Sequence, residues 1–252
     1  MKPALGGRFR RAPGVRPLVL GHRGSPQRAP ENTLSSFELA RQEGADGVEF
    51  DVRLDGSGEV VVFHDRTLSR MTAERSRARV DQLGTSELRR IELGKGERIP
   101  LLGEVLELAR AHDLCLNVEL KASPGSRRRL VARVAEQLRR EPRGAERLLL
   151  SCFDPWVVWW LSHTLPGLAV AWLVHDQQRL LKYGVGRGLL GAAGINPQHT
   201  LLEPARVERW KRGGGLVNTW TVNDPALARR YAELGVDSII SDVPGAILAA
   251  LG

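Results

Sequence analysis

The sequence predicts a (β/α)8 barrel, the TIM-barrel fold of the α/β class. Short apolar segments alternate with segments of helical period from end to end, and eight such units fit into 252 residues. A doubly wound parallel sheet is the alternative, and it would more often show fewer strands and a Gly-rich phosphate loop after the first strand. The eight repeated units therefore favour the barrel.

Each unit begins with an apolar segment that we interpret as a buried strand. The strands are predicted near residues 18–23, 47–54, 114–120, 147–153, 168–174, 191–196, 215–221 and 237–241. The helices that follow them are predicted to begin near Glu31, Pro100, Ser126, Pro155, Asp176, Glu203, Pro225 and Pro244. Several of these starts carry Pro, which the first turn of a helix tolerates.

Two segments fall outside this rhythm. Residues 1–17 carry five basic residues and no acidic one, which predicts a solvated, disordered tail. The stretch "GSGEVVVFHD" indicates a turn and a strand-like extension of the second strand, and the polar, Arg-rich residues 66–99 follow it. We interpret residues 66–99 as an insertion, a small cap subdomain, within a single barrel domain of residues 18–252.

Composition excludes several classes of function. Apolar residues make up 42% of the chain, yet the longest apolar runs are far too short to span a bilayer, so no transmembrane segment is expected. The net charge is +8, but the Arg residues are scattered among acidic neighbours, so nucleic-acid binding is not expected. Cys115 and Cys152 lie in apolar runs, which indicates two reduced core thiols and a cytoplasmic location.

Polar side chains gather where the predicted strands end, which is where barrel enzymes place their chemistry. They are His22 and Arg23 on the first strand, Glu49 and Asp51 on the second, His64 and Asp65 on its extension, Glu119 and Lys121 on the third, and Trp220 on the seventh. Residues two apart on a strand share a face, so Glu49 and Asp51 point the same way.

Three carboxylates are thereby expected at one point, because the second and third strands are neighbours in a barrel. Glu49, Asp51 and Glu119 would repel one another unless a cation lay between them. An all-oxygen ligand set without Cys favours a hard ion, so we predict one divalent cation, Mg²⁺ or Ca²⁺.

The remaining groups suit phosphodiester cleavage. His22 and His64 supply imidazole groups, whose unperturbed pKa of about 6.5 allows proton transfer in either direction near neutral pH. Arg23 and Lys121 supply fixed positive charge for a phosphate. Trp220 is expected to form a wall of the pocket. His175 and His199 are expected at the pocket rim, with His199 among the substrate-binding residues. Glu31 is expected either to orient Arg23 or to cap the first helix.

The ordered motifs resemble those of the glycerophosphodiester phosphodiesterases. They are "HRG" at 22–24, "PENT" at 30–33, "VEFDV" at 48–52, "VVVFHD" at 60–65, "RIP" at 98–100, "NVELK" at 117–121, "WTVND" at 220–224 and "GVDSIISDVP" at 235–244. The resemblance covers nearly the whole chain. Ser238 and Ser241 stand where the family commonly has Gly and Thr, and the insertion lacks the family's usual Gly-rich turn.

The resemblance implies a barrel with a small insertion after its second strand, and hydrolysis of glycerophosphodiesters to sn-glycerol 3-phosphate and an alcohol. It implies that His22 and His64 are the general acid–base pair and that Glu49, Asp51 and Glu119 hold the metal. It further implies that Arg23 and Lys121 bind the phosphate.

Several alternatives stay open. The substrate could be a lysophospholipid, which an apolar rim around the pocket mouth would favour, or the barrel could be a non-catalytic phosphodiester-binding module. The Trp-rich segment "PWVVWWLSH" is expected to pack against the barrel, although an exposed part of it would permit transient contact with a membrane surface. The chain is expected to be a monomer or a homodimer.

Overall fold

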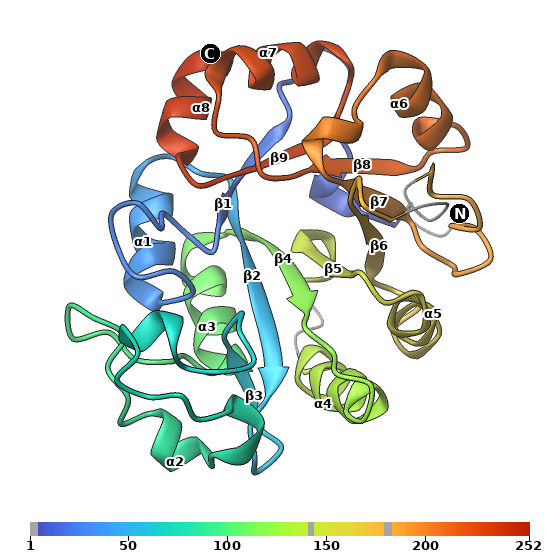
Figure 1. The fold of residues 1–252 in the computed structure, drawn as a ribbon. Helices are drawn as coiled ribbons and strands as arrows, with labels where there is room; N and C mark the ends of the chain where they lie inside the picture. The colour runs from blue at the N-terminus through green and yellow to red at the C-terminus, as the bar shows by residue number, and fades with distance from the viewer. Residues whose placement is uncertain (1–4, 141–143, 179–182) are drawn as a thin grey trace.

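A closed ring of eight parallel strands forms the centre of the computed structural model, which describes residues 5–140, 144–178 and 183–252 (Figure 1). The eight strands of the ring are β1 (Leu18–His22), β2 (Gly47–Leu54), β4 (Cys115–Leu120), β5 (Leu148–Cys152), β6 (Ala169–Val174), β7 (Gly194–Pro197), β8 (Leu216–Thr219) and β9 (Ser238–Ser241), and β3 (Val60–Val62) lies outside the ring. β1 pairs with both β9 and β2, which closes the barrel. β3 is the predicted extension and runs antiparallel to β2. The eight predicted strands are confirmed.

Helices surround this ring, except for the short α2, which lies in the insertion (Figure 1). They are α1 (Leu34–Gln42), α2 (Thr85–Leu88), α3 (Leu102–His112), α4 (Arg127–Leu138), α5 (Pro155–Thr164), α6 (Pro204–Lys211), α7 (Pro225–Glu233) and α8 (Pro244–Leu251), with 3₁₀ turns η1 (Gly7–Phe9), η2 (Arg70–Thr72), η3 (Val80–Gln82), η4 (Ala145–Arg147) and η6 (His199–Leu201). Asp154 and Asp224 cap α5 and α7, and each is followed by Pro at the first helical position. No helix in the described ranges is long and apolar enough to cross a membrane.

Two predicted helix starts are wrong. α1 begins at Leu34, not near Glu31, because Asn32 has a positive φ of 58° and the Thr33 side chain caps the helix by accepting from Ser36 N. Between β6 and β7 a helix was predicted from Asp176, but the described residues there form turns, and residues 179–182 lie outside the described part. The glycine-rich stretch at residues 184–191 disfavours a helix, and three of its glycines have positive φ.

The buried apolar side chains form three clusters. The largest lies between the strands and the helices, and a second fills the inside of the barrel. The third belongs to the insertion, where Phe63, Leu68 and Val80 pack with Leu88 and Ile99. The insertion therefore has its own small core, although its exact boundaries stay a prediction.

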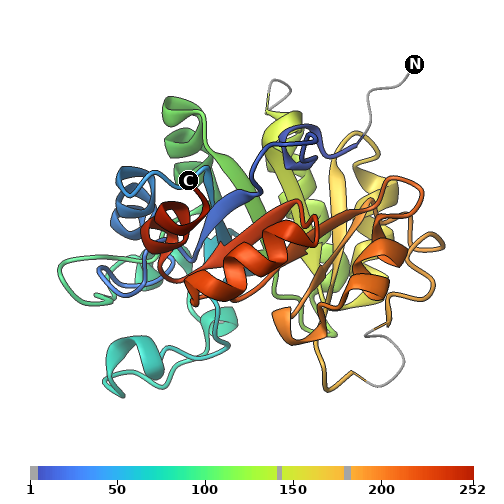
Figure 2. The same cartoon turned by 90° about the horizontal axis from the view of Figure 1, so that it is seen from above.

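The N-terminal segment differs from the predicted disordered tail. Phe9 is fully buried and packs with Leu149, Ala169 and Leu216 inside the barrel. Arg11 donates from its backbone N to Asp237 at 3.1 Å. Packing of Phe9 in one end of the barrel thus orders a segment whose basic composition predicted disorder. The insertion lies at the other end of the barrel (Figure 2). Residues 1–4 lie outside the described part.

Candidate active site

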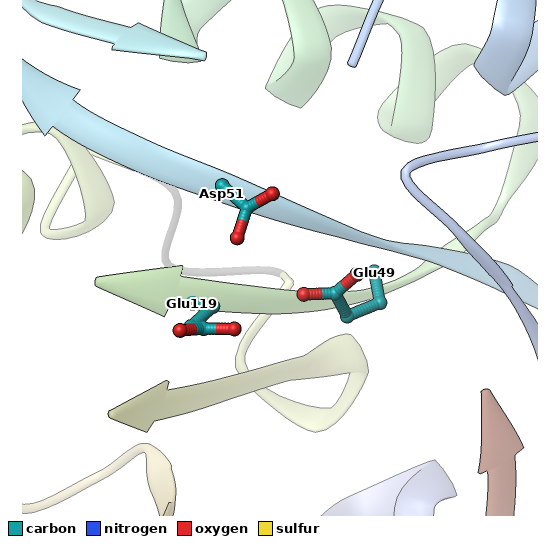
Figure 3. A group of neighbouring side chains, drawn as sticks. All are labelled: Glu49, Asp51 and Glu119. Carbon is teal, nitrogen blue, oxygen red and sulfur yellow. The ribbon is translucent and has the colours of Figure 1, made fainter. Parts of the chain in front are cut away.

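Three carboxylates meet at the carboxyl ends of β2 and β4. Glu49 and Asp51 lie on β2, and Asp51 is paired in register with Glu119 on the neighbouring β4. One oxygen of each lies within 4.8 Å of the others, and all three side chains are buried. Figure 3 shows them turned toward one another. The strand register thus brings together the three residues that the sequence singled out.

Basic groups and an amide hold Asp51 in place. The Asn32 side chain donates to Asp51 Oδ2 at 2.9 Å. Arg23 Nε lies 3.1 Å from the same oxygen, and Lys121 Nζ lies 3.2 Å from Asp51 Oδ1 and 2.5 Å from Glu119 Oε1. Burial by itself raises the pKa of Asp51, but Lys121 and Arg23 outweigh it, so its pKa lies below the ordinary value.

Glu49 has a different environment on the same strand. Its Oε2 accepts no hydrogen bond from any described residue, and His22 Nε2 lies 3.9 Å away. Burial, with the neighbouring charge of Asp51, raises the pKa of Glu49 to about 8. Burial likewise raises the pKa of Glu119 despite its ion pair with Lys121.

These properties fit a divalent cation. The donor set is three carboxylates with no sulfur, and the Glu49 oxygen is buried without a hydrogen bond. Once ionised, as metal binding requires, the three carboxylates carry three negative charges, whereas Arg23 and Lys121 supply two positive ones. These five groups together carry a net charge of −1, which a divalent cation would change to +1. A phosphodiester, with its single negative charge, would then neutralise the site.

His22 is the first of two histidines at the same end of the barrel. Its Nδ1 donates to Asp242 Oδ1 at 2.6 Å, which leaves Nε2 on the side of Glu49. Burial lowers the pKa of His22, but the hydrogen bond to Asp242 and the charge of Glu49 outweigh it, so the pKa is raised. This histidine therefore has a fixed orientation and a stabilised protonated form.

His64, the second histidine, is also held by hydrogen bonds. Its Nδ1 donates to Asp65 Oδ1 at 2.5 Å, and its backbone oxygen accepts from Arg53 at 2.8 Å. Burial, together with the charges of Lys121 and Arg23, lowers its pKa in spite of Asp51 and Asp65. The two histidines thus share a hydrogen-bonding pattern but differ in the direction of their pKa shifts.

Both histidines line one cavity of about 260 Å³. The residues lining it are His22, Arg23, Glu49, His64, Asn117, Glu119, Lys121, Ser151, Phe153, Leu173, Trp220, Thr221 and Ile240. Trp220 lies edge-on to Phe153 with ring centroids 5.6 Å apart, and its indole N–H donates to Asn196 O at 2.9 Å. The polar groups thus face an aromatic wall across a space suited to a small molecule.

His199 does not belong to this group. Its Nδ1 lies 3.2 Å from the Tyr231 hydroxyl on α7, and it is not among the residues that line the cavity. Its contact with Tyr231 on α7 gives no support to the predicted role of His199 in substrate binding, which stays a prediction. His175 stays near the cavity by packing edge-on against Phe153.

Three residues that hydrogen-bond to side chains of the site or to their partners were not found from the sequence. Asp242 follows β9, which pairs with β1, so the closure of the barrel was the signal that could have found it. Asn32 lies within a quoted motif, but its contact with Asp51 depends on the positive φ of a loop residue. Arg70 lies in the insertion, where no periodic pattern marks its position. Glu31 orients Arg23, since its Oε1 accepts from the Arg23 guanidinium at 2.7 Å.

Known proteins resemble this chain along most of its length. Residues 22–246 match the family described as the glycerophosphoryl diester phosphodiesterase family. A glycerophosphodiester phosphodiesterase of Caldanaerobacter subterraneus is 31% identical over 245 residues, which cover 93% of this chain and 97% of that protein. A second enzyme of that name, from Bacillus altitudinis, is 30% identical and covers 90% of this chain and 94% of its own length.

Solved structures resemble the fold as well. A phosphodiesterase of Oleispira antarctica, solved in complex with the product sn-glycerol-3-phosphate, has a TM-score of 0.85 and 31% identity, covering 93% of this chain and 96% of that one. A glycerophosphodiester phosphodiesterase of Parabacteroides distasonis has a TM-score of 0.80 and 26% identity, covering 94% and 97%.

Proposed function

This chain belongs to the glycerophosphoryl diester phosphodiesterase family, and from that premise we propose that it hydrolyses glycerophosphodiesters to sn-glycerol 3-phosphate and an alcohol with His22 and His64 as acid and base. One observation carries the proposal. The two histidines, each held at Nδ1 by an aspartate, line the same cavity beside a buried carboxylate cluster.

Substrate binding follows from the groups around that cavity. Arg23 and Lys121 bind the phosphate oxygens, since both line the cavity and their ion pairs with the carboxylates position the two positive charges there. Trp220 and Phe153 form the apolar wall against the glycerol carbons. The cavity of about 260 Å³ is of the size of a headgroup, so the distal alcohol extends toward solvent.

Glu49, Asp51 and Glu119 are the residues that would hold one divalent cation, Mg²⁺ or Ca²⁺. When bound, such a cation supplies positive charge that stabilises the negative charge developing on the phosphoryl group. Lys121 and Arg23 orient the carboxylates for that role through their ion pairs.

The histidines carry out the proton transfers. One removes the proton from the attacking hydroxyl as its oxygen bonds to phosphorus, and the other protonates the leaving alkoxide as its bond to phosphorus breaks. The attacking oxygen is that of water, or that of the adjacent glycerol hydroxyl, which gives a cyclic phosphate that water then opens. Detection of a cyclic glycerol phosphate early in the reaction would identify the second route.

Release of sn-glycerol 3-phosphate from a panel of glycerophosphodiesters, with and without chelator, tests this function. We expect turnover of at least one headgroup diester that stops with chelator and returns with Mg²⁺ or Ca²⁺. Turnover that persists after complete removal of divalent cations would contradict the proposed metal dependence.

We further propose that the protein is a cytoplasmic monomer or homodimer with no role in binding nucleic acid.

The lysophospholipid alternative has one observation in its favour. Trp156 and Trp159 on α5 are 63% and 37% exposed, and α4 beside them is rich in arginine, including Arg128, which lies over the Trp160 ring at 5.1 Å. Exposed tryptophans next to basic residues suit the surface of an anionic membrane. Sedimentation with phosphatidylglycerol vesicles, lost in Trp156→Ala/Trp159→Ala, would support transient membrane contact, and no sedimentation of the wild type would contradict it.

A further inference from the structure

Arg70 makes contacts that are unusual for a half-exposed side chain. It lies in η2, within the insertion, and its side chain is 50% exposed. Its two terminal nitrogens donate to the two oxygens of Glu31 at 2.8 and 2.7 Å, and its Nε donates to Asp65 Oδ2 at 2.7 Å. Each of its guanidinium nitrogens therefore bonds to one of two carboxylates that come from different parts of the chain.

Both carboxylates bond in turn to groups that line the cavity. Glu31 Oε1 accepts from Arg23 at 2.7 Å, and Asp65 Oδ1 accepts from His64 Nδ1 at 2.5 Å. Arg70 is thus one residue removed from both the phosphate-binding Arg23 and the catalytic His64. The fork geometry of a guanidinium fixes the relative positions of the two carboxylates, which a lysine would not do.

Other arginines of the insertion show what a merely superficial ion pair looks like. Arg77 is 80% exposed and pairs with Glu74, three residues away, and Arg79 pairs with Asp81, two residues away. Neither contact reaches a residue of the cavity. Arg70 differs because its partners lie in the loop after β1 and in the segment after β3.

The backbone at Arg70 is anchored on both sides. Leu68 is fully buried in the core of the insertion, and Thr72 is buried as well. The Thr72 hydroxyl donates to Leu68 O at 2.9 Å and accepts from Ser76 N at 3.1 Å. The small core of the insertion therefore fixes the backbone from which the Arg70 side chain extends.

We propose that Arg70 is a positioning residue through which the insertion aligns Arg23 and His64 with each other. This proposal rests on the roles of Arg23 and His64 in the proposed function. It assigns to the insertion a part in catalysis, although none of residues 66–99 lines the cavity.

Steady-state kinetics of Arg70→Met with a glycerophosphodiester provide the first test, and Arg77→Met is the matched control. We expect kcat to fall and KM to rise, together lowering kcat/KM by about ten- to a hundredfold, because small misplacements of aligned groups are costly. Arg70→Lys should recover only part of the loss. Kinetics of Arg70→Met that match those of Arg77→Met would overturn the proposal.

A double-mutant cycle and a spectroscopic readout separate positioning from folding. If Arg70 acts through Asp65, the loss of kcat/KM in the double variant Arg70→Met/Asp65→Asn should be much smaller than the product of the two single losses. A loss equal to that product would contradict the link. The ¹⁵N NMR signals of the His64 ring should change in Arg70→Met, or in Arg70→Lys if the former is unfolded, and stay unchanged in Arg77→Met. The ring signals do not depend on turnover, so an inactive wild type would refute the proposed function while leaving this test of Arg70 intact.

Discussion

Nδ1 of His22 lies 2.6 Å from Oδ1 of Asp242, although 220 residues separate the two in the chain. The contact exists because β1 and β9 pair to close the barrel, and both residues lie at the carboxyl ends of those strands. The other oxygen of the same carboxylate, Asp242 Oδ2, accepts from the Asn223 side-chain amide at 2.6 Å, which helps to hold Asp242 in place. Closure of the barrel thereby fixes one of the two proposed catalytic histidines.

Asp242→Asn tests that contact. Asp242 helps to raise the pKa of His22, so its loss should lower that pKa and shift the limb of the pH–rate profile that reports His22 to lower pH. We expect kcat to fall by roughly ten- to a hundredfold because the ring also loses its orientation. Asp81→Asn, an exposed aspartate of the insertion, is the control, and equal pH profiles for the wild type and Asp242→Asn would refute the link.

Metal binding has a readout that does not depend on activity. Mg²⁺ or Ca²⁺ at about a hundred times its Kd should stabilise the native state by about 2.7 kcal/mol, which raises Tm by several degrees. Glu49→Gln should abolish that rise. Without metal the same variant should be at least as stable as the wild type near neutral pH, because an uncompensated buried carboxyl is removed.

The exposed Glu107→Gln serves as the matched control and should keep the full metal-induced rise in Tm. A rise of the same size in Glu49→Gln would exclude Glu49 as a ligand.

The sequence was sufficient for the barrel and for the side chains at the strand ends. Alternation of apolar and helical segments is local, so all eight parallel strands were predicted near their observed places. The same local pattern was misleading at residues 184–191, where the glycines disfavour the helix that the alternation predicted. It was misleading at Phe9 as well, because this residue can be buried only once the barrel has formed. The basic composition of residues 1–17 had predicted a disordered tail.

The supporting partners were harder to predict, for a physical reason. Glu49, Asp51 and Glu119 could be placed together because strand period and strand adjacency fix them. Asp242 and Arg70 act through loops whose positions depend on barrel closure and on the core of the insertion. His199 shows the converse, because a position near a strand end did not determine where its side chain turned.

Glu31 predicts a specific acid sensitivity of folding. Burial raises the pKa of Glu31, but hydrogen bonds from Arg70 and Arg23 outweigh it, so the folded-state pKa lies below 4.5. The stability that Glu31 contributes is therefore complete above its unfolded pKa and is lost as the pH falls through the lower folded pKa. In Glu31→Gln, the free energy of unfolding should fall less steeply below pH 4.5, and an unchanged slope would contradict this role.

Trp220 predicts a change in substrate affinity. Replacing it with Ala removes the aromatic wall opposite the charged groups, so we expect KM to rise by about tenfold with a smaller change in kcat. Trp220→Phe should retain much of the affinity. Trp156→Ala, on the outer face of α5, is the control and should leave KM for a soluble diester unchanged. A normal KM in Trp220→Ala would show that the ring does not contact substrate.

The most direct measurement is the rate of sn-glycerol 3-phosphate release by the wild type, His22→Ala, His64→Ala and the double variant at saturating metal. General acid–base catalysis contributes about 10²–10⁴-fold, so each single variant should lose at least a hundredfold in kcat. The double variant should be little worse than the poorer single one, because the two groups act as a unit. Rates of both single variants close to that of the wild type would contradict the assignment of the two histidines.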